Sequence, residues 1–130
     1  MRFIPLLALP LLAACVTADG TEGAAAACPE TRGWAAWVNL MPGAGATPTL
    51  IVTGEARVRA GSTVTLTVGP TDRMMPPGQR FALNVVNGGG VAGWRAVRGE
   101  VKSALPDYRE VIVGCDGVTV ARISPVEKAY

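Results

Sequence analysis

No histidine occurs anywhere among the 130 residues of this chain. Histidine is the usual general base and the commonest metal ligand, so the common nucleophile–histidine pairs are excluded. The carboxylates show no calcium-loop spacing. Two of them could meet in space as a glycosidase pair, but Glu55, Glu100 and Glu110 each lie near an arginine in a strand-like segment, as solvated cross-strand partners do. We therefore expect a protein that is not an enzyme and uses no metal or cofactor.

The segment Asp72-Arg73-Met74-Met75 is the best candidate for binding a partner. Two adjacent methionines ahead of Pro76-Pro77-Gly78 cannot both be buried, so at least one is expected to meet solvent or another protein. A copper site made only of methionine would need more soft donors than this segment offers. The alternative is an ordinary loop packed on the end of the domain.

Three tryptophans, Trp34, Trp37 and Trp94, could form a stacking platform for a glycan or a peptide. The chain has only 5% aromatic residues, so at least one tryptophan is expected to fill the centre of the core. We predict that Trp37 does so.

Two other features argue against ligands of common types. The Gly-rich run 87–90 lacks the Lys-Ser/Thr of a phosphate-binding loop, so we predict a flexible loop between strands. The formal net charge is only +2 and the arginines are scattered, which is not typical of a nucleic-acid-binding protein.

The three cysteines divide into a pair and a single residue. Cys28 and Cys115 are expected to form a disulfide in an oxidising compartment, which would join the beginning of the domain to a late strand. Two unpaired buried thiols are the alternative. Cys15 stands apart and lies directly behind an apolar N-terminal stretch.

The N-terminus has the layout of a secretory signal: Arg2, the apolar run 3–12, then small residues. A ten-residue helix spans only ~15 Å, too short to cross a bilayer. Leu12-Ala13-Ala14-Cys15 resembles the lipobox of bacterial lipoproteins. This resemblance implies removal of residues 1–14, acylation of Cys15, and anchorage in a membrane by lipid.

Val16, in place of Asp, favours sorting to the outer membrane, with the protein facing the periplasm. A competing site follows Val16-Thr17-Ala18, where cleavage by an ordinary signal peptidase would release a soluble periplasmic protein. In the lipoprotein reading, residues 15–27 form a flexible tether and residues 28–130 form one domain.

From residue 33 onward, short runs alternate between apolar and polar residues, which is typical of β-strands. The expected strands are 33–41, 49–59, 63–68, 80–86, 94–102, 108–115 and 118–123. Residues 33–41 could instead form a helix, which would place Trp34 and Trp37 on one face, but the strands expected elsewhere favour a strand here as well. The expected inward residues include Leu50, Val52, Ala56, Val58, Val64, Leu66, Val68, Phe81, Leu83 and Val85.

Two turns predict hairpins. Ala60-Gly61 is expected to join strands 49–59 and 63–68, and Asp116-Gly117 suits a type I′ turn after strand 108–115. With many Gly and Pro residues between the runs, the pattern predicts an all-β fold: a small antiparallel, immunoglobulin-like β-sandwich or a partly open barrel with one disulfide.

The segments 36–43 (AWVNLMPG) and 50–54 (LIVTG) resemble small uncharacterised periplasmic proteins of Gram-negative bacteria. This resemblance implies compartment and fold, and no site residues. The sequence thus predicts a non-catalytic outer-membrane lipoprotein that serves as a binding or structural accessory of the envelope, with an envelope protein as its partner. The alternative is a protein inhibitor of an envelope-directed enzyme, such as a lysozyme or a protease.

Overall fold

The computed structural model describes residues 28–130. The signal peptide, Cys15 and the tether predicted for residues 1–27 lie outside the described residues. The described strands are β1 (Thr31–Asn39), β2 (Thr49–Arg59), β3 (Thr63–Thr71), β4 (Gly78–Val86), β5 (Ala92–Val101), β6 (Glu110–Cys115), β7 (Val118–Ile123) and β8 (Glu127–Ala129). Within residues 28–130, the structure has no helix of the length and apolarity needed to span a bilayer.

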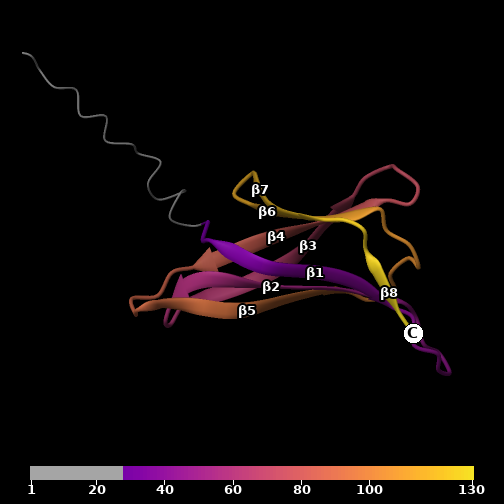
Figure 1. The fold of residues 1–130 in the computed structure, drawn as a ribbon, viewed down its shortest axis with the longest axis horizontal. Coiled ribbons are helices and arrows are strands. Elements are labelled where there is room, and N and C mark those ends of the chain that lie inside the picture. The colour runs from indigo at the N-terminus through magenta and orange to yellow at the C-terminus, as the bar shows by residue number, and fades with distance from the viewer. Residues whose placement is uncertain (1–27) are drawn as a thin grey trace, which may run out of the picture.

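The strands form two layers (Figure 1). The first sheet has the order β5-β2-β1-β8 and the second has the order β3-β4-β6-β7. The predicted all-β sandwich is confirmed, and the sheets do not close into a barrel. Both sheets are mixed, because β1 pairs with β8 and β4 pairs with β6 in parallel, whereas the sequence predicted antiparallel pairing.

The core lies between the two sheets, and the central strands supply its most deeply buried residues. The largest fully buried side chains are Leu50, Val38, Val52, Val111 and Val113. The predicted inward face of β2 is confirmed. On the edge strand β3 the burial is weaker: Val64 and Leu66 are half-buried, and Val68 is 46% exposed. The prediction that Val68 is buried was therefore wrong, because an edge strand has a covering neighbour on one side only.

The predicted hairpin of β2 and β3 is wrong. The turn itself is present, since Ser62 N–H donates to the Arg59 carbonyl over 3.0 Å and Gly61 has a φ of 82°. The chain, however, passes from one sheet to the other at this turn, so β2 pairs with β1 and β5 while β3 pairs with β4. Alternating residues require only that each strand turn one face to the core, and facing strands satisfy this as well as adjacent strands do.

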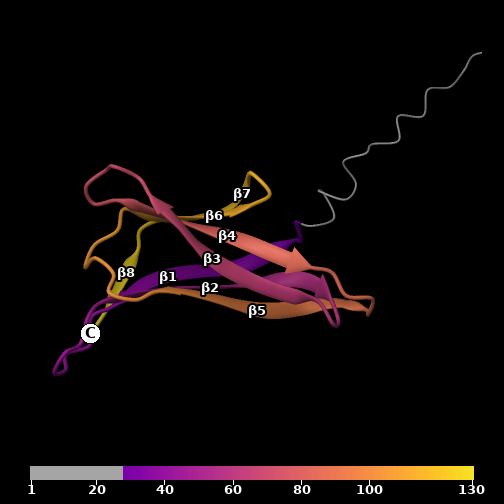
Figure 2. The same ribbon diagram turned by 180° about the vertical axis from the view of Figure 1, so that it is seen from behind.

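The second predicted hairpin is confirmed. β6 and β7 pair antiparallel, and Asp116 and Gly117 have φ values of 51° and 80°, as a type I′ turn requires. The edge strands β3 and β5 of opposite sheets lie next to each other, which is visible from both sides of the molecule (Figures 1 and 2).

The core tryptophan is Trp34, not Trp37 as predicted. Ala36 and Val38 point into the core, so Trp37 lies on the outer face of the first sheet, opposite Ile51 of β2. Trp34 packs against the core, and its indole covers Gly54 so closely that a Cβ there would lie 2.5 Å from the ring. The choice of Trp37 was wrong because side chains alternate along a strand, so that Trp34 shares the inward face with Ala36 and Val38 while Trp37 lies on the other face.

Cys28 and Cys115 form the predicted disulfide, which links the segment just before β1 to the end of β6. It joins the two sheets across a sequence separation of 87 residues. On the chain-entropy model a bridge of this span contributes about 4–5 kcal/mol, close to the whole net stability of a small domain.

We expect Gly54→Ala to lower the free energy of unfolding by roughly 1–3 kcal/mol, because the new methyl group would overlap the Trp34 ring. Urea unfolding would measure the change. Gly93→Ala is the matched control, since a Cβ at Gly93 of β5 meets nothing within 4 Å. Equal stability of the two variants would contradict the packing of Trp34 on Gly54.

Candidate functional site: the methionine end of the sandwich

The loops between β1 and β2, β3 and β4, and β5 and β6 gather at the end of the sandwich that also holds the C-terminus (Figure 1). We call this the methionine end. The opposite end, which holds Cys28 and the turn at Asp116, is the cysteine end. Strand direction alone determines this grouping, because β2, β4 and β6 begin where β1, β3 and β5 finish.

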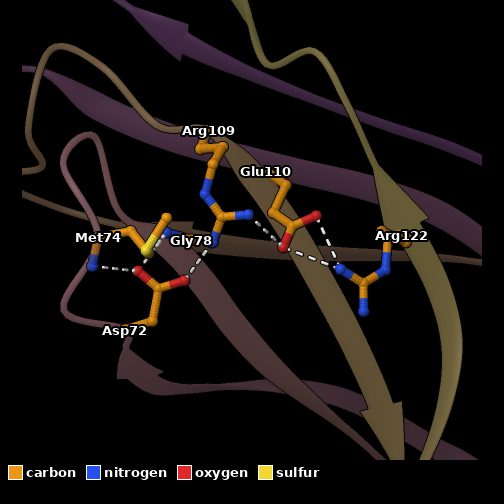
Figure 3. Close-up of polar contacts among 6 residues, drawn as sticks. All are labelled: Asp72, Met74, Gly78, Arg109, Glu110 and Arg122. Carbon is orange, nitrogen blue, oxygen red and sulfur yellow. Dashed lines mark hydrogen bonds and ion pairs between the residues drawn. The ribbon is translucent and has the colours of Figure 1, made fainter.

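The loop after β3 is held by Asp72, whose side chain turns back onto the loop (Figure 3). Asp72 Oδ1 accepts hydrogen bonds from the backbone N–H of Met74 at 2.9 Å and of Gly78 at 3.0 Å. Its Oδ2 forms an ion pair with Arg109. Backbone bonds close the loop further: Asp72 N–H to the Gly78 carbonyl at 3.1 Å, and Arg109 N–H to the Pro77 carbonyl at 2.9 Å.

The ion pair continues into the second sheet. Glu110 of β6 accepts from Arg109 Nη1 at 3.0 Å and from Arg122 Nη1 at 2.9 Å to each of its oxygens (Figure 3). The Glu110 side chain is only 9% exposed, and its charge is balanced by these two guanidinium groups. We call the residues Asp72, Arg109, Glu110 and Arg122 the ionic chain. It couples the methionine loop to two strands of the sheet.

Residue 78 must be glycine because the ionic chain passes close to its backbone. A Cβ there would lie 2.8 Å from Asp72 Oδ2 and 3.2 Å from Arg109 Nη2. Any side chain at residue 78 would therefore displace the carboxylate or the guanidinium from the ionic chain.

The pKa of the Asp72 carboxyl is lowered from its ordinary value of 3.8. The hydrogen bond from Gly78 N–H is the largest cause; partial burial opposes it, and Met74 N–H and Arg109 lower the pKa further. The carboxylate therefore stays ionised, and holds the loop, to a lower pH than an unperturbed aspartate would.

This arrangement leaves the two methionines facing outward. Met74 is 56% exposed and Met75 is 87% exposed. Met75 lies beside Leu105, itself 46% exposed, around an open groove of about 470 Å³. The groove is lined by Met75, Pro76, Pro77, Leu105, Pro106 and Asp107.

The opposite wall of the groove is anchored as well. Leu105 N–H donates to the hydroxyl oxygen of the buried Tyr108 at 3.1 Å, and Ala104 N–H donates to the Pro48 carbonyl at 2.8 Å. Asp107 forms an ion pair with Lys128 of β8. Both walls are thus tied to the sandwich, so the groove is a preorganised apolar surface.

The predicted candidates have different parts in this site. Met74 and Met75 are both exposed, whereas the sequence predicted exposure of at least one. Arg73 is also exposed and forms no ion pair among the described residues. Asp72 is turned inward and orders the loop. The sequence analysis missed Leu105 and Pro106, although apolar residues in a loop are a signal that could have been used. The pairing of Arg109 with Asp72 leaves no signal in the sequence that could have predicted it.

The other candidates from the sequence, which are the carboxylates, the tryptophans and the Gly-rich run 87–90, do not form a site at the methionine end. In the part of the chain that the structure describes, no three His, Cys, Asp or Glu residues lie close enough to hold a metal ion. Trp94 is covered on one face by Arg32, whose guanidinium carbon lies 3.9 Å from the ring centroid. The 87–90 run is packed on the β2–β3 turn, with Gly88 N–H donating to Ser62 Oγ at 2.8 Å, so the predicted flexible loop is held in place.

Comparison of this chain with protein-family models, curated proteins and solved structures finds no match.

We expect Asp72→Asn to be less stable than the wild type at neutral pH, because it loses the ion pair with Arg109. A lowered pKa in the folded state stabilises the protein above pH 3.8, and this stabilisation is lost as the pH falls below 3.8. The two stability curves should therefore converge in acid. Unfolding monitored by denaturant at a series of pH values measures this.

Glu127→Gln serves as the control, because Glu127 is exposed and takes part in no ion pair within residues 28–130. Its curve should run parallel to that of the wild type. Curves of wild type and Asp72→Asn that stay parallel throughout would contradict the role of Asp72.

Proposed function

We propose that this protein is a non-catalytic accessory of the bacterial envelope that binds an envelope protein through its methionine end. The observation that carries the proposal is the exposure of Met74 and Met75 on a loop that the ionic chain holds in one conformation. An ordered loop loses little conformational entropy on binding, so its apolar contacts contribute fully to affinity. Methionine suits such a surface, because its flexible thioether side chain adapts to irregular apolar partners.

The proposed location follows from the N-terminal sequence. Acylation of Cys15 would anchor the chain at the outer membrane, with residues 28–130 in the periplasm. The Cys28–Cys115 disulfide supports an oxidising compartment. Since Cys28 lies at the opposite end from Met75, a chain tethered through residues 15–27 would leave the methionine end free for a partner.

Inhibition of an envelope-directed lysozyme or protease is the second candidate function. It is favoured by Met75, which protrudes with 87% exposure from a loop held by Asp72. Rigid protruding loops are what preorganised enzyme inhibitors present to an active site. Assays against a lysozyme and a panel of periplasmic proteases distinguish this candidate, which predicts micromolar or tighter inhibition that Met75→Ser weakens.

The docking proposal is tested by a photo-crosslinking amino acid at residue 75 in the full chain, expressed in a Gram-negative host. We expect one dominant envelope adduct from residue 75, because Met75 lies at the rim of the apolar groove. A crosslinker at Val118 is the control, since Val118 is similarly apolar and 62% exposed but lies at the cysteine end.

The double variant Met74→Ser/Met75→Ser should reduce the affinity for the crosslinked protein by about tenfold or more, because it removes two thioether side chains that the partner would bury on binding. Binding unchanged in this variant, or equal adducts from residues 75 and 118, would contradict docking at the methionine end.

The anchor is tested by intact-mass spectrometry on the membrane fraction. We expect a mature chain that begins at Cys15 and carries the added mass of acyl groups. Cys15→Ser should abolish the added mass and release the protein from the membrane. A chain beginning at Asp19 without acyl mass would show that cleavage after Ala18 produces a soluble protein instead.

A further inference from the structure

A second concave site lies at the cysteine end, far from the methionine loop. It is an open pocket of about 500 Å³ between the end of β2, the segment before β1 and the start of the β4–β5 loop. Arg57 and Arg59 form one wall, and Pro29, Glu30 and Gly88 contribute to the others. The pocket takes no part in the function proposed above.

Arg57 and Arg59 are placed on the same face of β2, because side chains two residues apart on a strand point the same way. Their Cα atoms are roughly 7 Å apart in an extended strand. Neither guanidinium has a carboxylate partner within residues 28–130. The two exposed like charges repel each other weakly, and an anion between them would relieve this repulsion.

The neighbouring arginines are occupied in a way that these two are not. On the same sheet, Arg32 pairs with Glu55 and Arg98 pairs with Glu100. Arg32 also covers Trp94, which lies opposite Arg57 in the register. The charges of Arg57 and Arg59 therefore have no ion-pair partner among the described residues, and they outnumber Glu30, the single carboxylate of the pocket lining.

Glu30 is the one acidic residue in the lining. Its backbone carbonyl accepts from Arg57 N–H at 2.8 Å, which places its residue at the pocket, but its carboxylate forms no ion pair with a described residue. Its negative charge would repel an anionic ligand, so removing this charge tests whether the pocket binds anions.

We propose that this pocket binds a phosphate group between Arg57 and Arg59. A carboxylate has two oxygens and is satisfied by one guanidinium, whereas a phosphate has enough oxygens to accept hydrogen bonds from two. The phosphate belongs either to a small soluble molecule or to a phospholipid headgroup. Because the pocket is open, it admits both.

Binding is tested with the full chain carrying Cys15→Ser, so that no acyl group contributes to membrane attachment. One arm measures binding of inorganic phosphate by NMR chemical shifts of the pocket residues. The other measures co-sedimentation with vesicles of phosphatidylethanolamine and phosphatidylglycerol. We expect Arg57→Gln/Arg59→Gln to weaken binding by about tenfold or more, as expected for the loss of two charged hydrogen-bond donors, and Glu30→Gln to strengthen it.

Arg80→Gln/Lys102→Gln is the matched control, since it removes the same charge from two exposed basic residues outside the pocket. It should leave binding unchanged. Binding in both arms identifies the headgroup as a source of the phosphate, and binding of inorganic phosphate alone identifies a soluble molecule. Absence of binding in both arms, or equal losses in the two double variants, would overturn the proposal.

Discussion

Everything else in this molecule depends on the burial of alternate aliphatic side chains between two sheets. Leu50 and Val52 of β2 and Val111 and Val113 of β6, which belong to opposite sheets, are fully buried in one core. At roughly 1.5–3 kcal/mol for each such side chain, this layer is the main source of stability. The directions of the strands that bury this layer decide which loops share an end of the sandwich.

The disulfide and the ionic chain secure the two ends of this sandwich in different ways. At the cysteine end, Cys28 and Cys115 join the sheets covalently, which stabilises the fold because the bridge lowers the conformational entropy of the unfolded chain. At the methionine end, Asp72 and Glu110 use partly shielded ionic hydrogen bonds to hold a loop that has little core of its own. One end therefore depends on redox state and the other depends on ionisation.

The predictions from sequence succeeded where a pattern needs only one strand. Period-two alternation predicted the inward face of β2, and Asp116-Gly117 predicted the turn between β6 and β7, because both features depend on neighbouring residues alone. They failed where a second strand decides. The partners of β2 are β1 and β5 rather than β3, and the core tryptophan is the one that packs over Gly54.

The amino-acid sequence by itself determined the fold class, the pairing of Cys28 with Cys115, and that the adjacent methionines would not both be buried, because composition, cysteine count and local polarity are properties of the chain. Only the tertiary structure decided that Asp72 holds the loop and that Arg57 and Arg59 share a pocket with Glu30. These groupings join residues far apart in sequence. They arise from sheet order, which is set by packing between layers and is not encoded in any single segment.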